Sequence, residues 1–160
     1  MRGVALFGAG VLFGVALQPA TTPPNGIVGL NHVSIRVENF DQAVAFYSKT
    51  LGLKEAFAFR EPDGSPYMTY FQVNRDTFIE LMPVGPGKPA GFAHIGLQVS
   101  DVKALAARLR QQGMKVGEPS ISPRTKSEIV TATDPFGTNM ELMEFGPNSL
   151  HYKVIHDWKH

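Results

Sequence analysis

The sequence contains no cysteine, which excludes disulfides, thiolate metal ligands and thiol nucleophiles together. It also has no excess of one charge, since 15 Lys and Arg residues face 14 Asp and Glu residues, and it has no run of basic residues. We therefore expect no nucleic-acid partner. At 160 residues and 43% hydrophobic composition, the chain is long enough for one packed domain and too apolar to be disordered. A catalytic metal, if there is one, must be bound by His, Asp or Glu.

Long hydrophobic runs are lacking as well, except at the N-terminus. Residues 3–17 carry no polar side chain and follow Arg2. These fifteen residues, at about 1.5 Å each in a helix, are too short for a hydrocarbon layer of about 30 Å, and the pattern is typical of a signal peptide. We expect residues 1–25 to be a leader whose removal gives an exported protein, periplasmic or secreted, without a membrane span. An uncleaved leader would anchor the chain to a membrane.

The remaining residues contain an internal repeat. Residues 31–37 (Asn-His-Val-Ser-Ile-Arg-Val) align with residues 93–99 (Ala-His-Ile-Gly-Leu-Gln-Val), and each stretch precedes an amphipathic segment that ends at a glycine. Each copy later contains a Glu-Leu-Met motif, and the His-to-Glu offset is 48 residues in the first copy and 47 in the second. Offsets that agree this closely, with matching motifs at both ends, indicate two copies of one unit.

Each copy reads as a strand, a helix and three further strands, which gives an α+β chain of two tandem βαβββ modules, at about residues 28–84 and 91–146. The helices are expected at 41–51 and 101–112, and the later strands at 55–59, 67–73, 77–84, 115–120, 128–133 and 139–145. A module of about 55 residues buries little surface alone, so the copies should pack on each other or on those of a second chain. Residues 147–160 form a C-terminal tail without a defensible motif.

Four residues at equivalent positions of the two copies point to a metal site. Each first strand bears a histidine and each last strand a glutamate: His32, Glu80, His94 and Glu141. Taken singly, such a His is more often a hydrogen-bonded residue and such a Glu a solvated one. Both carboxylates, however, share a strand face with largely apolar neighbours, where an ionised group needs a cation or donors. The joint pattern predicts one centre with nitrogen and oxygen ligands, which suits Zn, Ni, Co, Mn or Fe(II).

Several motifs resemble the vicinal oxygen chelate superfamily, which includes the glyoxalases, methylmalonyl-CoA epimerases, extradiol dioxygenases and bleomycin-resistance proteins. They are the two His-x-x-[Ile/Leu]-x-Val strands, the Phe46-Tyr47…Leu51-Gly52 helix end, and the stretches 91–102 and 134–142. The resemblance runs over residues 28–146. It implies that the modules form a curved, cup-like mixed sheet with flanking helices around one divalent metal, and it puts the four residues on the ligand positions of glyoxalase-like members.

By resemblance, the expected activity is that of a glyoxalase-like lyase or isomerase acting on a small substrate with adjacent oxygens. In such enzymes the metal stabilises an enediolate, and a ligand glutamate, here Glu141 or Glu80, carries the proton. Arg36 follows His32 by four residues on the same strand face, so it could bind a substrate carboxylate. Arg124 and Lys126, in the loop of residues 122–127, are two further candidates. Solvated surface charge is the alternative for all three.

Two other functions are compatible with the sequence. An extradiol-type Fe(II) dioxygenase uses two histidines and one carboxylate, and Glu80 as a fourth ligand argues against it. A non-catalytic binding or resistance protein would sequester a small molecule through the same metal. The leader weakens the readings that use glutathione or coenzyme A, because those thiols are found mainly inside cells. A cup within one chain and a cup completed by a second copy in a homodimer both fit the sequence.

Overall fold

The computed structural model describes residues 23–159, so most of the expected leader lies outside the described residues. The elements of module 1 are β1 (Ile27–Val37), α1 (Phe40–Ala45), the π-helical turn η1 (Phe46–Thr50), β2 (Lys54–Arg60), β3 (Pro66–Gln72) and β4 (Phe78–Pro83). Those of module 2 are β5 (Gly91–Val99), α2 (Val102–Gln111), β6 (Lys115–Val116), β7 (Ser120–Ile121), β8 (Glu128–Thr133) and β9 (Asn139–Glu144). A further helix, α3 (Leu150–His156), follows module 2.

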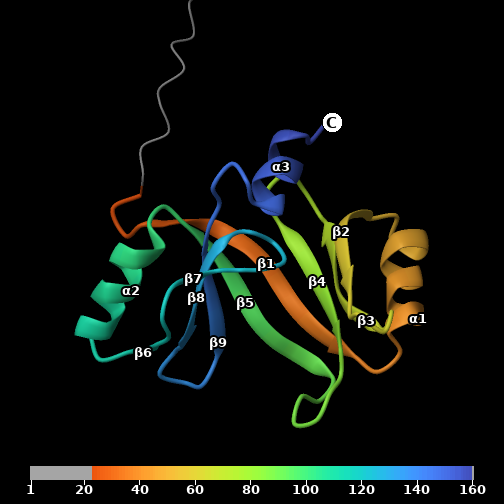
Figure 1. The fold of residues 1–160 in the computed structure, drawn as a ribbon, viewed down its shortest axis with the longest axis horizontal. Helices are drawn as coiled ribbons and strands as arrows, with labels where there is room; N and C mark the ends of the chain where they lie inside the picture. The colour runs from red at the N-terminus through yellow and green to blue at the C-terminus, as the bar shows by residue number, and fades with distance from the viewer. Residues whose placement is uncertain (1–22, 160) are drawn as a thin grey trace, which may run out of the picture.

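All nine described strands belong to one mixed sheet, in the order β2-β3-β4-β1-β5-β9-β8-β6, with β7 paired to β8. The first strands of the two modules, β1 and β5, pair with each other in antiparallel orientation at the centre. The last strand of each module pairs parallel to its own first strand, β4 to β1 and β9 to β5. Both modules of one chain therefore build the sheet, and the predicted α+β fold with a curved mixed sheet is confirmed (Figure 1).

The helices of the two modules cover the outer face of the sheet. Figure 1 shows α1 and α2 at opposite ends of the sheet, with α3 near β4. Val102, Leu105 and Ala106 of α2 pack into a buried cluster with side chains of β5, β8 and β9. Tyr47 of η1 stacks on Phe71 of β3, with 5.8 Å between ring centroids. Since side chains alternate along a strand, residues adjacent to these core positions face the opposite, concave side.

Three elements differ from the sequence-based expectation. The helix expected at 41–51 becomes a π turn after Ala45, where the Leu51 amide donates to the Phe46 carbonyl, five residues back. The strand expected at 115–120 is split into β6 and β7, because Pro119 lacks an amide hydrogen for a sheet bond. The tail contains α3, which begins where Ser149 accepts a hydrogen bond from the Tyr152 amide. No helix within residues 23–159 has the length and apolarity needed to cross a membrane.

Candidate metal centre

The central strands bring the two predicted His–Glu pairs together on the concave face. Two rows cross the sheet there, since His32 is paired with Gly96 and Gly96 with Glu141, while Ser34 is paired with both Glu80 and His94. The duplication relates the two rows, because each contains the histidine of one module and the glutamate of the other. A small residue two positions after each histidine, Ser34 or Gly96, leaves room for the side chains to converge.

The four side chains meet at close range within one chain. The Nε2 atoms of His32 and His94 are 3.0 Å apart. The Oε2 atom of Glu80 lies 3.2 Å from His94 Nε2 and 3.8 Å from His32 Nε2. The Oε2 atom of Glu141 lies 3.6 Å and 3.9 Å from the same two nitrogens. The structure thus gathers all four predicted ligand side chains.

This arrangement passes a geometric test for a divalent metal. Bonds of about 2.1 Å to nitrogen and oxygen place neighbouring ligand atoms about 3.0–3.4 Å apart, close to the separations found here. One ligand atom each from His32, His94 and Glu141 lies within 4.8 Å of the others. The Oε2 atom of Glu80 is buried without a hydrogen-bond partner, although it belongs to a carboxylate. A cation between these atoms would supply the missing partner.

Asn31 orients His32 for this role. β1 has one more residue than β5 between Leu30 and His32, and this bulge brings the Asn31 Oδ1 atom within 2.9 Å of His32 Nδ1. The Asn31 amide nitrogen donates to the Asp76 carbonyl at 3.3 Å, so Oδ1 is left to accept from Nδ1–H of His32. The lone pair of His32 is then on Nε2, which faces the other three side chains.

The electrostatics of the metal-free chain differ between the two modules. Burial lowers the pKa of His32 to about 4, although Glu80 opposes the shift. Burial alone would raise the pKa of Glu80, but the adjacent imidazoles of His94 and His32 outweigh it and lower this pKa to about 2. Burial raises the pKa of Glu141 to about 6, with His94 opposing the shift and Glu80 adding to it. Glu141 is therefore the carboxylate better suited to accept and release a proton near neutral pH.

The His–Glu pairs of the two modules also differ in their exposure to solvent. The side chains of His32 and Glu80 are 0% and 2% exposed, whereas those of His94 and Glu141 are 11% and 23% exposed. A cavity of about 330 Å³ opens beside the second pair. Its lining residues come from β1, β5, β8 and β9: Arg36, Ala93, His94, Thr131, Ala132, Thr133, Asn139, Met140 and Glu141. This cavity therefore gives a substrate access to the centre from the module-2 side.

The predicted substrate-binding cations occupy different places. Arg36 lines the cavity together with His94 and Glu141. Arg124 instead pairs with Glu61 at 3.0 Å and lies 3.3 Å above the Tyr67 ring, so its charge is held between the modules. Lys126 lines a separate hollow with Ile121, Glu128 and Glu144. Of the three, only Arg36 lies beside the His/Glu group.

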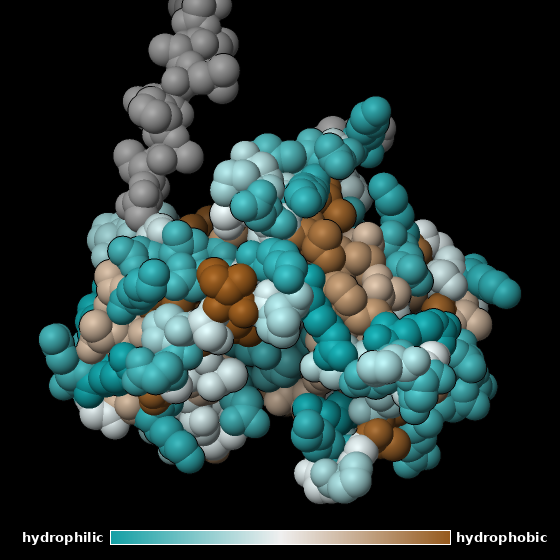
Figure 2. Space-filling model, viewed as in Figure 1, coloured by the Kyte–Doolittle hydropathy of each residue, from teal (hydrophilic) through white to brown (hydrophobic). Residues whose placement is uncertain are grey.

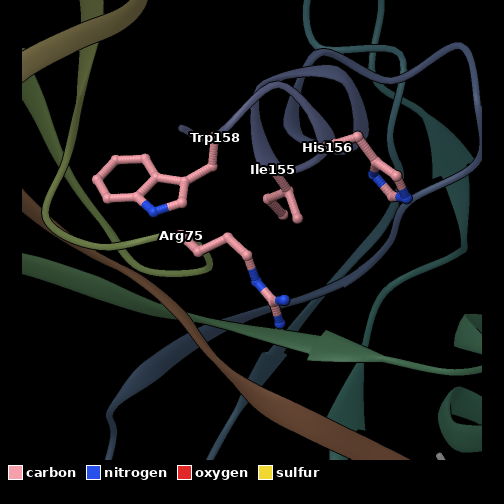
Figure 3. Close-up of a pocket in the computed structure, with 4 residues that line it drawn as sticks. All are labelled: Arg75, Ile155, His156 and Trp158. Atoms are coloured by element: carbon pink, nitrogen blue, oxygen red, sulfur yellow. The ribbon is translucent and has the colours of Figure 1, made fainter. Parts of the chain in front are cut away.

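Another hollow, of about 440 Å³, lies at the end of α3. It is lined by Arg75, Ile155, His156 and Trp158 (Figure 3). It shares no lining residue with the cavity beside His94, and none of its four residues carries a carboxylate. The concave face, and not this hollow, therefore holds the groups that can bind a metal.

Sequence reasoning did not identify the small and polar residues that support the four side chains. A Cβ atom on Gly96 would lie 2.1 Å from the His32 ring, so only glycine fits beneath that ring. The signal was present in the repeat, since Ser34 and Gly96 occupy the same position after each histidine. Asn31 gave no signal of its own, because its role depends on the bulge in β1.

The comparisons agree with this geometry. The model of the Glyoxalase/Bleomycin resistance protein/Dioxygenase superfamily matches residues 29–142. An ethylmalonyl-CoA/methylmalonyl-CoA epimerase of Cereibacter sphaeroides is 36% identical over 111 residues, which cover 61% of this chain and 82% of that protein. A probable lactoylglutathione lyase of Synechocystis is 30% identical over 123 residues, covering 72% and 94% respectively.

A longer relative and a solved structure extend the comparison. A probable chloroplastic lactoylglutathione lyase of Arabidopsis thaliana is 30% identical over 130 residues, but this chain spans only 35% of its length. Among solved structures, methylmalonyl-CoA epimerase from Mycobacterium tuberculosis superposes with a TM-score of 0.68 at 24% identity, covering 80% of this chain and 95% of that one. The match of the family model over more than half of the chain shows that the chain belongs to the glyoxalase/bleomycin resistance protein/dioxygenase superfamily.

Proposed function

We propose that this chain is a divalent-metal-dependent enzyme that transfers a proton between neighbouring carbons of a small substrate with adjacent oxygens, as in glyoxalase-type isomerisation. His32, Glu80, His94 and Glu141 would hold the metal, which acts as a Lewis acid toward the substrate oxygens when bound. The observation that carries the proposal is the asymmetry of the two carboxylates. Glu141 is the more exposed and has a pKa raised to about 6.

The remaining steps belong to the side chains of the cavity. A substrate carboxylate binds the Arg36 guanidinium at the cavity wall. Glu141 takes the proton from the carbon next to the carbonyl and returns it to the adjacent carbon on the same side. Inversion at one carbon would need a proton carrier on each face of the substrate. Glu80 is 2% exposed, whereas Glu141 is 23% exposed. Glu141 is therefore the carboxylate that a substrate reaches more readily, which favours isomerisation by one proton carrier over inversion by two.

Substitution of Glu141 by Gln tests the proton-transfer role. Turnover of a methylglyoxal hemithioacetal should fall at least about a hundredfold, because the amide cannot accept a proton in the relevant range. Substrate binding, measured by calorimetry on the metal-loaded protein, should fall much less. Glu118→Gln is the matched control, because Glu118 is 87% exposed and pairs with Arg110 on the surface. Its turnover should equal that of the wild type.

The metal is tested separately by elemental analysis of protein purified without affinity-metal contact. We expect about one divalent ion per chain in the wild type and a loss in His32→Ala. An equal metal content in both proteins would contradict the proposed centre. Stoichiometric metal without turnover of hemithioacetals, catechols or epimerisable acids would instead support a binding protein over an enzyme.

A further inference from the structure

The duplication gives the concave face two equivalent halves, but they are lined differently. Tyr70 is paired with Glu80 on β3 and β4, and Thr131 is paired with Glu141 on β8 and β9. Phe78 and Asn139 likewise each lie two residues before the glutamate of their own module. The module-1 half is thus lined by two buried aromatic rings, whereas Thr131 and Asn139 are exposed and line the cavity.

Helix α3, which has no counterpart after module 1, fills the aromatic half. Its buried His151 stacks on Phe145 at 4.7 Å and meets the rings of Phe57, Tyr70 and Phe78 edge to face at 5.0–5.5 Å. Tyr70 in turn meets the His32 ring at 5.4 Å. On the face shown in Figure 2, brown and tan surface gathers beneath α3, where this helix meets the strands. His151 therefore closes the side of the centre that carries His32 and Glu80.

Several hydrogen bonds hold α3 in this position. The Leu150 amide donates to the Thr125 carbonyl at 2.8 Å, and Ser127 Oγ lies 3.2 Å from His151 Nδ1. The Gln72 side chain donates to the Val154 carbonyl at 3.4 Å. Arg124, in the loop that carries Thr125 and Ser127, reaches across to Glu61 of module 1. The far end of α3 lies over the β3–β4 turn, where Ile155 faces Arg75 (Figure 3).

We propose that the substrate occupies only the module-2 half of the cup, with α3 as a fixed wall on the other side, and that Thr131 and Asn139 determine what fits there. This inference rests on the proposed function. A cavity of about 330 Å³ is at the small end of ligand sites. Its walls offer Arg36 and the neutral hydrogen-bonding side chains of Thr131, Thr133 and Asn139. The substrate class that this lining fits is a compact oxo or hydroxy carboxylate.

Substitutions that copy the module-1 lining into module 2 test the inference. Thr131→Tyr and Asn139→Phe place rings where the open half now is, and each site is exposed, so the fold should tolerate them. Oxalate, a compact dianion with adjacent oxygens, serves as the probe in calorimetry on Zn²⁺-loaded protein. Both variants should bind oxalate at least about tenfold more weakly, because the ring occupies the space of the ligand. Their Zn²⁺ affinity should equal that of the wild type, because Tyr70 and Phe78 already flank Glu80 in this way.

Two controls complete the experiment. Thr50→Tyr adds the same ring at an exposed position of η1 and should leave oxalate affinity unchanged. His151→Ala should also leave it unchanged, because the substrate does not enter the filled half. The inference is overturned if Thr131→Tyr and Asn139→Phe bind oxalate as well as the wild type, or if a folded His151→Ala loses as much affinity as they do. Failure of the wild type to bind Zn²⁺ would instead overturn the proposed function.

Discussion

The His32 imidazole lies over the Cα atom of Gly96, and this contact fixes the distance between the two histidines. Replacement of Gly96 by Ala would put a methyl group 2.1 Å from ring atoms of His32. The ring would have to move away from His94 Nε2, now 3.0 Å from its own Nε2. We expect Zn²⁺ affinity, measured by competition with a chromophoric chelator, to fall about tenfold or more, as for loss of a group that orients a ligand.

Gly29→Ala is the matched control for that measurement. Gly29 lies on β1, the strand of His32, and a Cβ atom there meets nothing within 4 Å. Its Zn²⁺ affinity should equal that of the wild type. Wild-type affinity in Gly96→Ala would show that the His32 ring does not need its present position.

At the scale of single residues, the candidate metal ligands could be predicted from the sequence, whereas the residues that make room for them or orient them could not. His32, Glu80, His94 and Glu141 were recognisable because the duplication repeats them at nearly equal offsets. Gly96 and Asn31 were not, because the need for glycine comes from a ring on a neighbouring strand, and the role of Asn31 comes from a bulge. Arg124 also could not be placed, since its partners, Glu61 and Tyr67, lie in the other module.

Among the elements, α3 makes the stability of the fold depend on pH, through the buried His151. Burial lowers the pKa of His151 to about 3, from 6.5. The unfolded chain therefore binds a proton below about pH 6.5 that the folded chain does not bind, so this residue lowers stability as the pH falls from 6.5 toward 3. At pH 5 the loss should be about 2 kcal/mol, at about 1.36 kcal/mol for each pH unit.

Substitution of His151 by Phe should remove this contribution. The variant's free energy of unfolding, from urea titrations, should fall less between pH 7 and pH 5 than that of the wild type. His156→Phe is the control for adding a phenyl ring to this helix, because His156 lies on its exposed side. Equal slopes in the wild type and His151→Phe would contradict the prediction.

The elements themselves could be predicted where periodicity was strong. The strand β8 has the bounds expected from the sequence, and α2 differs by one residue at each end. The π turn η1 was missed because one extra residue in a turn leaves no trace in the hydrophobic pattern. Helix α3 was missed because the tail has no counterpart in the repeat, and its buried face consists chiefly of a histidine.

At the scale of the whole molecule, the ligands come from both modules, so metal binding should stabilise the entire sheet. At a free Zn²⁺ concentration of about one hundred times the Kd, the free energy of unfolding should rise by about 2.7 kcal/mol. Thermal unfolding with added Zn²⁺ and with a chelator measures this shift. His32→Ala should show a much smaller one, and an equal shift in that variant would place the stabilising ion elsewhere.

The antiparallel pairing of β1 with β5 is the seam along which the two modules meet, and it lies between the two histidines. Adjacent strands in a sheet are rotated against each other, and the rotation differs from one strand pair to another. A change in the twist between β1 and β5 would change the angle between the two modules. Because the two imidazoles lie on either side of this strand pair, such a change would alter the distance between their Nε2 atoms. The spacing of the metal-binding nitrogens thus depends on the arrangement of the whole sheet.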